Sequence, residues 1–117
     1  MKRKTRVFVS GPMTTGDASV NLRNAIDAAE ELVRAGYVPI VPHLMYFWQI
    51  VHPHTWEEMM SICVEQVKAC DILFRLPGRS RGAKVEEEVA KGRGMPVVGN
   101  ITVLKAMYPA ERNDERE

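Results

Sequence analysis

The chain has 117 residues, of which 45% are hydrophobic and 26% are charged. This length fits one domain, and the composition is that of a folded protein rather than a disordered one. A net charge of only +1 provides no global positive field to hold a nucleic acid by many phosphate contacts. No apolar stretch reaches the roughly 18 residues that cross a membrane, and no leader pattern is present. We therefore expect a cytoplasmic protein without nucleic-acid or membrane partners.

Apolar and helical segments alternate along the chain. The predicted elements are, in chain order, strand 6–10, helix 20–35, strand 37–41, an aromatic loop between 42 and 55, helix 55–69, strand 71–76, helix 82–91 and strand 95–98. Gly36 follows the first helix as its cap. Pro39 lacks a backbone donor and favours an outer strand. Thr55 and Glu58 have the spacing of a capping box.

This alternation predicts an α/β fold with a doubly wound (Rossmann-like) parallel sheet of four to five strands, in a single domain over residues 1–111. The charged tail 112–117 is expected to be disordered. Such sheets bind ligands beyond the carboxyl ends of their strands. This rule selects the loops 10–16, 42–54 and 76–82.

Two cysteines, Cys63 and Cys70, lie in the second predicted helix and at its exit. A separation of seven residues puts them roughly 10 Å apart along a helix, which is too far for a disulfide. We expect two buried free thiols.

Three glutamates follow one another near the start of the third predicted helix. Glu87 precedes Lys91 by four residues, and Glu88 follows Lys84 by four, so both are expected to form surface pairs. Glu86 differs, because no basic residue lies three or four positions from it. An unpaired carboxylate on a small, apolar helix face is either functional or costly. It is interpreted as a catalytic acid or as a partly exposed surface acid.

Two loops carry residues that suit a phosphate or a ribose. Gly78–Gly82 brings Arg79, Ser80 and Arg81 to the start of a helix, where free amides and the helix dipole favour anions. The loop that begins Ser10-Gly11-Pro12-Met13 could approach a sugar through its backbone. Both are also ordinary turns in composition.

Other candidates keep two interpretations each. His43 follows the second strand and serves either as a ligand contact or as a structural histidine. The aromatic residues 46–48 stack on a base, cover the core or form a dimer contact. Trp56 is expected to pack. Asp71, at a strand entry, is expected to be a turn or cap residue rather than to have a direct role. His52 and His54 lack further ligands at recognisable spacing, so no metal site is expected.

Three segments together resemble the nucleoside 2-deoxyribosyltransferase superfamily, most closely its small phage-associated and bacterial branch with a Gly-Pro-Met loop. They are Val7–Met13, Pro42–Leu44 and Cys70–Glu86, and within the third segment Arg79 is not part of the match. The resemblance covers residues 6–100 and implies a flavodoxin-like fold and a homodimer. It also implies a nucleophilic glutamate at Glu86 and a phosphate-binding serine at Ser80, as in the family's nucleoside monophosphate hydrolases.

The chain departs from the family pattern at two positions. Phe8 stands where a tyrosine normally holds the nucleophile, and Cys63 aligns with an aspartate that assists the departing base. No C-terminal segment matches the one that completes a neighbour's site. The missing roles then pass to His43 or Glu65, or the fold serves only to bind ligands.

Our leading hypothesis is therefore a hydrolase that cleaves the N-glycosidic bond of a nucleoside 5′-monophosphate without a cofactor. In this hypothesis Glu86 is the nucleophile. Ser80 and Arg81 hold the phosphate, and the flanking residues Arg79 and Gly82 also contact the substrate. Residues Ser10 to Met13 shape the sugar site. The alternative is a non-enzymatic nucleotide or nucleotide-sugar sensor. A NAD glycohydrolase is the third hypothesis.

Overall fold

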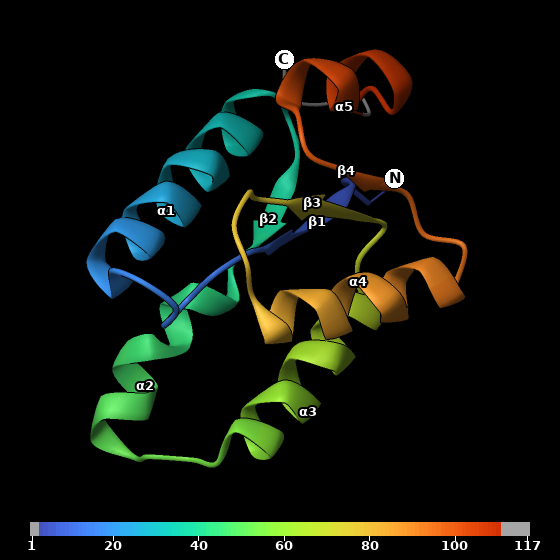
Figure 1. Cartoon of the computed structure of the whole chain (residues 1–117). Coiled ribbons are helices and arrows are strands. Elements are labelled where there is room, and N and C mark those ends of the chain that lie inside the picture. Colours follow the sequence, from blue (N-terminus) through green and yellow to red (C-terminus); the bar gives the residue numbers. More distant parts are fainter. Residues whose placement is uncertain (1–2, 111–117) are drawn as a thin grey trace.

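The computed structural model describes residues 3–110, which fold as one α/β domain (Figure 1). Four parallel strands form a single sheet in the order β2-β1-β3-β4. The strands are β1 Arg6–Ser10, β2 Val38–Ile40, β3 Ile72–Arg75 and β4 Val97–Val98. This order confirms the predicted flavodoxin-like fold, and β2, which contains Pro39, is an outer strand as expected. The tail 112–117 lies outside the described residues.

Helices cover both faces of the sheet. They are α1 Ala18–Arg34 and α5 Ile101–Met107 on one face, and α3 Trp56–Lys68 and α4 Arg81–Gly92 on the other (Figure 1). Because side chains alternate along a strand, Val7 and Val9 pack on the α1 and α5 side, while Phe8 packs on the α3 and α4 side. Ser10 continues the series that begins with Phe8, so its hydroxyl is turned toward α4.

Two predicted helix ends are confirmed. The amide of Glu58 donates to the Thr55 hydroxyl at 3.1 Å, and the amide of Thr55 donates to the Glu58 carboxylate at 2.8 Å, which completes the capping box. Gly36 follows α1 with a φ of 98°, a conformation that favours glycine.

The segment predicted as an aromatic loop is helical, so that expectation was wrong. A 3-10 helix, η1 Pro42–Met45, leads directly into α2 Tyr46–Val51. Residues 44–51 contain only one strongly polar side chain, Gln49, and therefore lack the alternation of apolar and polar faces from which a helix is predicted. The short helix α5 was also not predicted. Asn100 caps it, accepting from the amides of Thr102 and Val103 at 2.7 and 3.1 Å.

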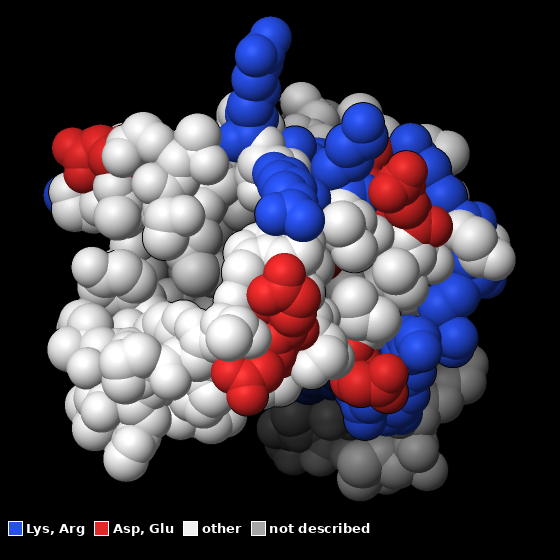
Figure 2. Space-filling model, turned by 60° about the horizontal axis from the view of Figure 1, so that its bottom comes forward, with Lys and Arg blue, Asp and Glu red and all other residues white. Residues whose placement is uncertain are grey.

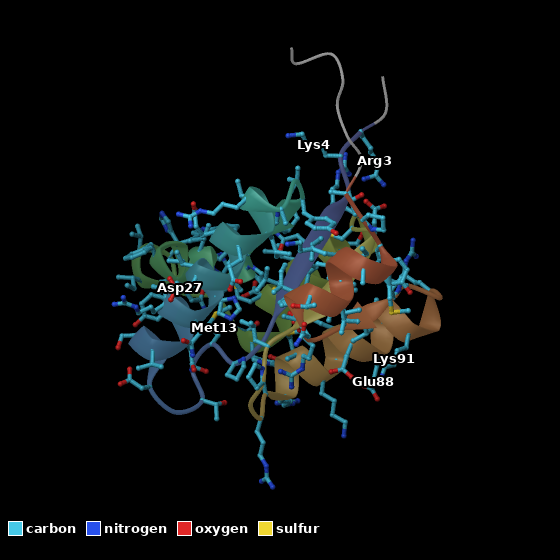
Figure 3. All side chains as sticks on the ribbon, turned by 90° about the horizontal axis from the view of Figure 1, so that it is seen from above. Arg3, Lys4, Met13, Asp27, Glu88 and Lys91 are labelled. Atoms are coloured by element: carbon cyan, nitrogen blue, oxygen red, sulfur yellow. The ribbon has the colours of Figure 1, made fainter. Side chains whose placement is uncertain are left out.

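The amino end of the sheet is closed by a structural ion pair. The Arg3 guanidinium donates to both oxygens of Asp71 at 2.6 and 2.9 Å, and the amide of Arg6 donates to Asp71 at 2.8 Å. Figure 3 shows Arg3 and Lys4 at this end and Met13 beyond the other end of β1. Asp71 therefore fixes a strand entry, as predicted, and lies far from the carboxyl-end loops.

Both cysteines are free and buried, as predicted. No helix within residues 3–110 combines the length and apolarity needed to cross a bilayer.

Candidate functional site

A cavity of about 470 Å³ lies beyond the carboxyl end of β1, between the η1–α2 segment and helices α3 and α4. In Figure 2 the lower left of the face is uncharged throughout, the surface is hollowed at the edge of this region, and Lys and Arg side chains lie on the other side of the hollow. The residues expected at a ligand site that line the cavity are Gly11, Met13, Ser80, Arg81, Gly82 and Glu86.

The carboxylate of Glu86 is the central polar group of this cavity. Only 5% of the residue is exposed, and the hydroxyl of Ser10 donates a hydrogen bond to its Oε1 at 2.7 Å. Burial raises the pKa of Glu86 to about 7, although hydrogen bonds from Ser10 and Cys63 and the charge of Arg75 act in the opposite direction. A carboxyl group with this pKa exchanges protons near neutral pH.

Ser10 was expected to contact substrate through its loop. The residue is fully buried, and its hydroxyl is engaged with Glu86. Its direct contact is therefore with the carboxylate, and it orients and stabilises that group.

Cys63, on α3, lies against Glu86 and also lines the cavity. Burial first, and then the neighbouring charge of Glu86, raise the pKa of the thiol to about 12. The thiol therefore stays protonated at neutral pH, and a protonated thiol can donate a hydrogen bond. Phe8, by contrast, is fully buried in the apolar cluster beneath α3 and α4 and offers Glu86 no polar group.

A glycine allows the cavity wall to form close to α4. A Cβ atom at Gly82 would lie 3.1 Å from the sulfur of Met60 and 4.0 Å from the indole nitrogen of Trp56. Any side chain at position 82 would press on α3, so the glycine permits the two helices to approach beside Glu86.

The start of α4 supplies the polar wall. Ser80 caps the helix by accepting from the amide of Ala83 at 3.1 Å, and its hydroxyl proton remains free to donate. The Arg81 guanidinium lies over the ring of Trp56, 3.9 Å from its centroid, a cation–π contact that fixes the charge at the cavity edge. Arg75 instead pairs with Glu87 at 3.0 Å and donates to the Gly78 carbonyl at 2.9 Å, holding the preceding loop.

Four residues predicted to bind substrate lie outside the cavity lining, namely Ser10, Pro12, His43 and Arg79. Arg79 is exposed and lines a second hollow together with Lys84, on the other side of Ser80 and Arg81, which line both. His43 is 1% exposed, and its Nε2 donates to the carbonyl oxygen of Pro12 at 3.0 Å. Burial lowers the pKa of His43. The contact between His43 and Pro12 therefore stabilises the loop after β1, and neither residue lies where it would contact a ligand in the cavity.

The other two glutamates of α4 are surface groups. Glu87 pairs with Lys91 at 3.1 Å, as predicted. The expected pair between Lys84 and Glu88 is not formed among residues 3–110, and Figure 3 shows Glu88 and Lys91 on the outer side of the helix. No group of three potential metal ligands occurs within the described part of the chain.

Several cavity residues were not identified from the sequence as parts of a site. Trp56, Met59 and Met60 share one side of α3 and form a wall opposite Gly82. Their spacing of three and four residues was available as a signal, but it is equally typical of a core-facing helix. Gln49 of α2, which was also not identified, lies on the opposite side together with Tyr46, one of the aromatic residues for which stacking on a base was an interpretation.

The family whose profile fits this sequence is described as a domain of unknown function, DUF4406, and the match covers residues 5–99. The chain belongs to the DUF4406 family. The matched segment includes all four strands and the whole cavity lining, and it ends before α5. A comparison with curated proteins finds no match.

Proposed function

We propose that this DUF4406 domain is a hydrolase that cleaves the N-glycosidic bond of a nucleoside 5′-monophosphate. The observation that carries the proposal is the buried carboxylate of Glu86, held by Ser10 at 2.7 Å on the wall of a cavity of about 470 Å³. Ser80 and Arg81 line the same cavity, so one ligand can place a sugar at the carboxylate and a phosphate at the start of α4.

The proposed reaction uses Glu86 in its ionised form. As the bond between C1′ and the base nitrogen breaks, its electron pair leaves with the base, and positive charge develops at C1′. An oxygen of Glu86 then bonds to C1′, giving a glycosyl ester. Water attacks C1′ next and releases the carboxylate. One proton of this water reaches the departed base and its hydroxyl group remains on the sugar, so no cofactor is required.

The neighbours of Glu86 suit this role. Ser10 donates to the carboxylate and the thiol of Cys63 lies against it, and both favour its charged form against the opposing effect of burial. The Ser80 hydroxyl and the Arg81 guanidinium provide a charge-assisted site for a phosphate. The resemblance to nucleoside monophosphate hydrolases, in which a serine stands six positions before the nucleophile, supports the same assignment for Ser80.

The test is direct incubation with nucleoside 5′-monophosphates, the matching nucleosides and NAD, followed by chromatography of the released base. The proposal predicts base release from monophosphates at a kcat/KM well above that for nucleosides. Absence of base release from every monophosphate, in ribo and deoxyribo form, would contradict it. Release from NAD alone would instead favour a NAD glycohydrolase.

A second candidate function is a nucleotide or nucleotide-sugar sensor. Within residues 3–110, Glu86 is the only carboxylate in the cavity lining, so no second acid stands ready to protonate the leaving base. Phe8 is buried in an apolar cluster and gives Glu86 no hydrogen bond, which also favours a binding role over catalysis. Saturable nucleotide binding without base release would support this candidate.

We also propose that the protein acts in the cytoplasm as a homodimer, joined through the surface that we call the α2 face. The α2 face consists of Leu44, Phe47, Ile50 and Val51, which are 55–71% exposed. Residues 42–56 contain no Lys, Arg, Asp or Glu, and the corresponding region of Figure 2 is uncharged. Two copies can therefore bring this face together without like-charge repulsion, and burying it removes apolar area from water.

A further inference from the structure

The cavity wall is unusually rich in methionine. Four of the seven methionines of the chain line it, namely Met13, Met45, Met59 and Met60. They come from three separate parts of the chain: the loop after β1, the η1 helix, and α3. Two aromatic residues, Tyr46 of α2 and Trp56 of α3, also line the cavity, on its two sides. Thioether side chains are flexible and polarisable, and they adapt to planar groups of different outline.

The one amide side chain in the lining is already engaged. Gln49 donates from Nε2 to the carbonyl of His54 at 2.8 Å, and its Oε1 accepts from the amide of His54 at 2.8 Å. The ring nitrogen Nδ1 of His54 approaches the same oxygen at 3.0 Å. If Gln49 formed hydrogen bonds with a base, these bonds to His54 would have to break. Gln49 therefore stabilises the turn between α2 and α3.

Two backbone carbonyls of the loop after β1 are engaged as well. The side-chain amide of Asn21 donates to the carbonyl of Thr15 at 2.7 Å and to the carbonyl of Met13 at 3.2 Å. The uncharged polar groups that remain in the lining, besides Ser80 and Cys63, are the hydroxyls of Thr14, Thr15 and Tyr46 and the indole N–H of Trp56. A hydroxyl both donates and accepts, and it can rotate to suit either pattern of a base edge.

We infer that the cavity binds the base of its nucleotide by stacking and dispersion against the methionine wall, and that purine and pyrimidine monophosphates are therefore all ligands. Strong discrimination requires fixed hydrogen-bonding groups that a wrong ligand leaves unpaired, and an apolar pocket lacks this means of rejection. The inference rests on the proposed function for the positions of the phosphate and the sugar. It adds to that function that the bound base can be either a purine or a pyrimidine.

Equilibrium binding to the Glu86→Gln variant of the full chain, in which turnover is blocked, tests this inference. The probes are the 5′-monophosphates of adenosine, guanosine, cytidine and uridine, their deoxy forms, and ribose 5-phosphate as a ligand without a base. Within each sugar series, we expect the dissociation constants of the nucleotides to agree within about tenfold. Ribose 5-phosphate should bind about 5- to 150-fold more weakly, because this is the range that stacking of one base contributes.

Two variants separate the methionine wall from the polar groups. Replacing Met59 with alanine should weaken all the nucleotides by a similar factor, whereas Met107→Ala, at an exposed position of α5, should change none. Gln49→Ala should leave the ratios between bases unchanged within about threefold, whatever it does to the absolute affinities, since its amide is already engaged.

A preference of more than about 100-fold for one base, beyond what an apolar pocket supplies, would overturn the inference. So would a ribose 5-phosphate affinity equal to that of the nucleotides, or base ratios that change tenfold in Gln49→Ala. If one monophosphate alone releases its base with the unaltered protein, the inference fails while the proposed function stands. If no monophosphate binds, both fail.

Discussion

The hydroxyl of Ser10 donates a hydrogen bond of 2.7 Å to Oε1 of Glu86, across 76 positions of sequence. The bond joins the last residue of β1 to α4 and is fully enclosed by protein on the serine side. It orients the carboxylate and stabilises its charged form, so the ionisation of Glu86 depends on the position of the central strand.

Replacing Ser10 with alanine should make Glu86 harder to ionise. A hydrogen bond to a charged group contributes about 1.5–3 kcal/mol, and a shift of one pKa unit corresponds to about 1.4 kcal/mol. In the unaltered protein we expect base release to increase with pH through about 7, the pKa of Glu86. In Ser10→Ala the midpoint of this profile should move up by roughly one unit or more. Ser61→Ala, at an exposed position of α3, is the control, and identical profiles for both variants would contradict the role of Ser10.

Removing the charge of Arg81 should weaken binding of the phosphate and leave the sugar and base contacts in place. We expect Arg81→Ala to raise the KM for a nucleoside monophosphate about tenfold to 100-fold, the range for a charge-assisted hydrogen bond. The KM for the corresponding nucleoside should be nearly unchanged. Arg93→Ala, at the exposed end of α4, should change neither constant. Equal effects on nucleotide and nucleoside would place the phosphate elsewhere.

The buried carboxyl of Glu86 should also be visible in the stability of the fold. Its pKa is raised from 4.5 to about 7, so the native state holds this proton more tightly than the unfolded chain does. The contribution to stability is complete below pH 4.5 and is lost as the pH rises through 7, with a full size of about 3 kcal/mol.

Glu86→Gln should remove this dependence. The free energy of unfolding, measured with urea for both proteins from pH 4 to pH 8, should shift in favour of the variant by up to about 3 kcal/mol as the pH increases. The difference between the two proteins at each pH cancels the opposite contribution of His43, whose pKa burial lowers. A difference independent of pH would show that Glu86 has an ordinary pKa.

A charge on the α2 face should prevent association of two chains. Phe47 is 62% exposed and does not line the cavity, so Phe47→Glu should convert a dimer into a monomer without loss of folding. Light scattering coupled to size-exclusion chromatography measures the mass. Val103→Glu, at a position of α5 that is 42% exposed, should remain dimeric. An unaltered chain that is monomeric at micromolar concentration would refute the dimer.

Local patterns were sufficient to predict most of the fold. The strand over 6–10, the capping box at Thr55 and the edge position of β2 follow from residue types within a few positions of one another. The helix α2 could not be predicted in this way. Its side chains are apolar on all sides, so periodicity carries no signal, and its exposed face gains no burial within one chain.

The site was predictable only in part. Glu86 could be identified because it lacks a basic neighbour on its own helix, which is local information. Its contacts with Ser10 and Cys63 depend on how β1, α3 and α4 pack together, and no spacing in the sequence encodes them. His43 shows the converse: its place after a strand suggested a ligand contact, while packing buries it against the Pro12 carbonyl.

The most direct test of the account compares Glu86→Gln with Glu88→Gln. The two positions lie half a turn apart on α4, and Glu88 is exposed whereas Glu86 faces the cavity. Base release from a nucleoside 5′-monophosphate should fall by at least about 1,000-fold in Glu86→Gln, because the amide cannot form the glycosyl ester. It should be unchanged in Glu88→Gln. Release that continues at the unaltered rate in Glu86→Gln would contradict the central claim.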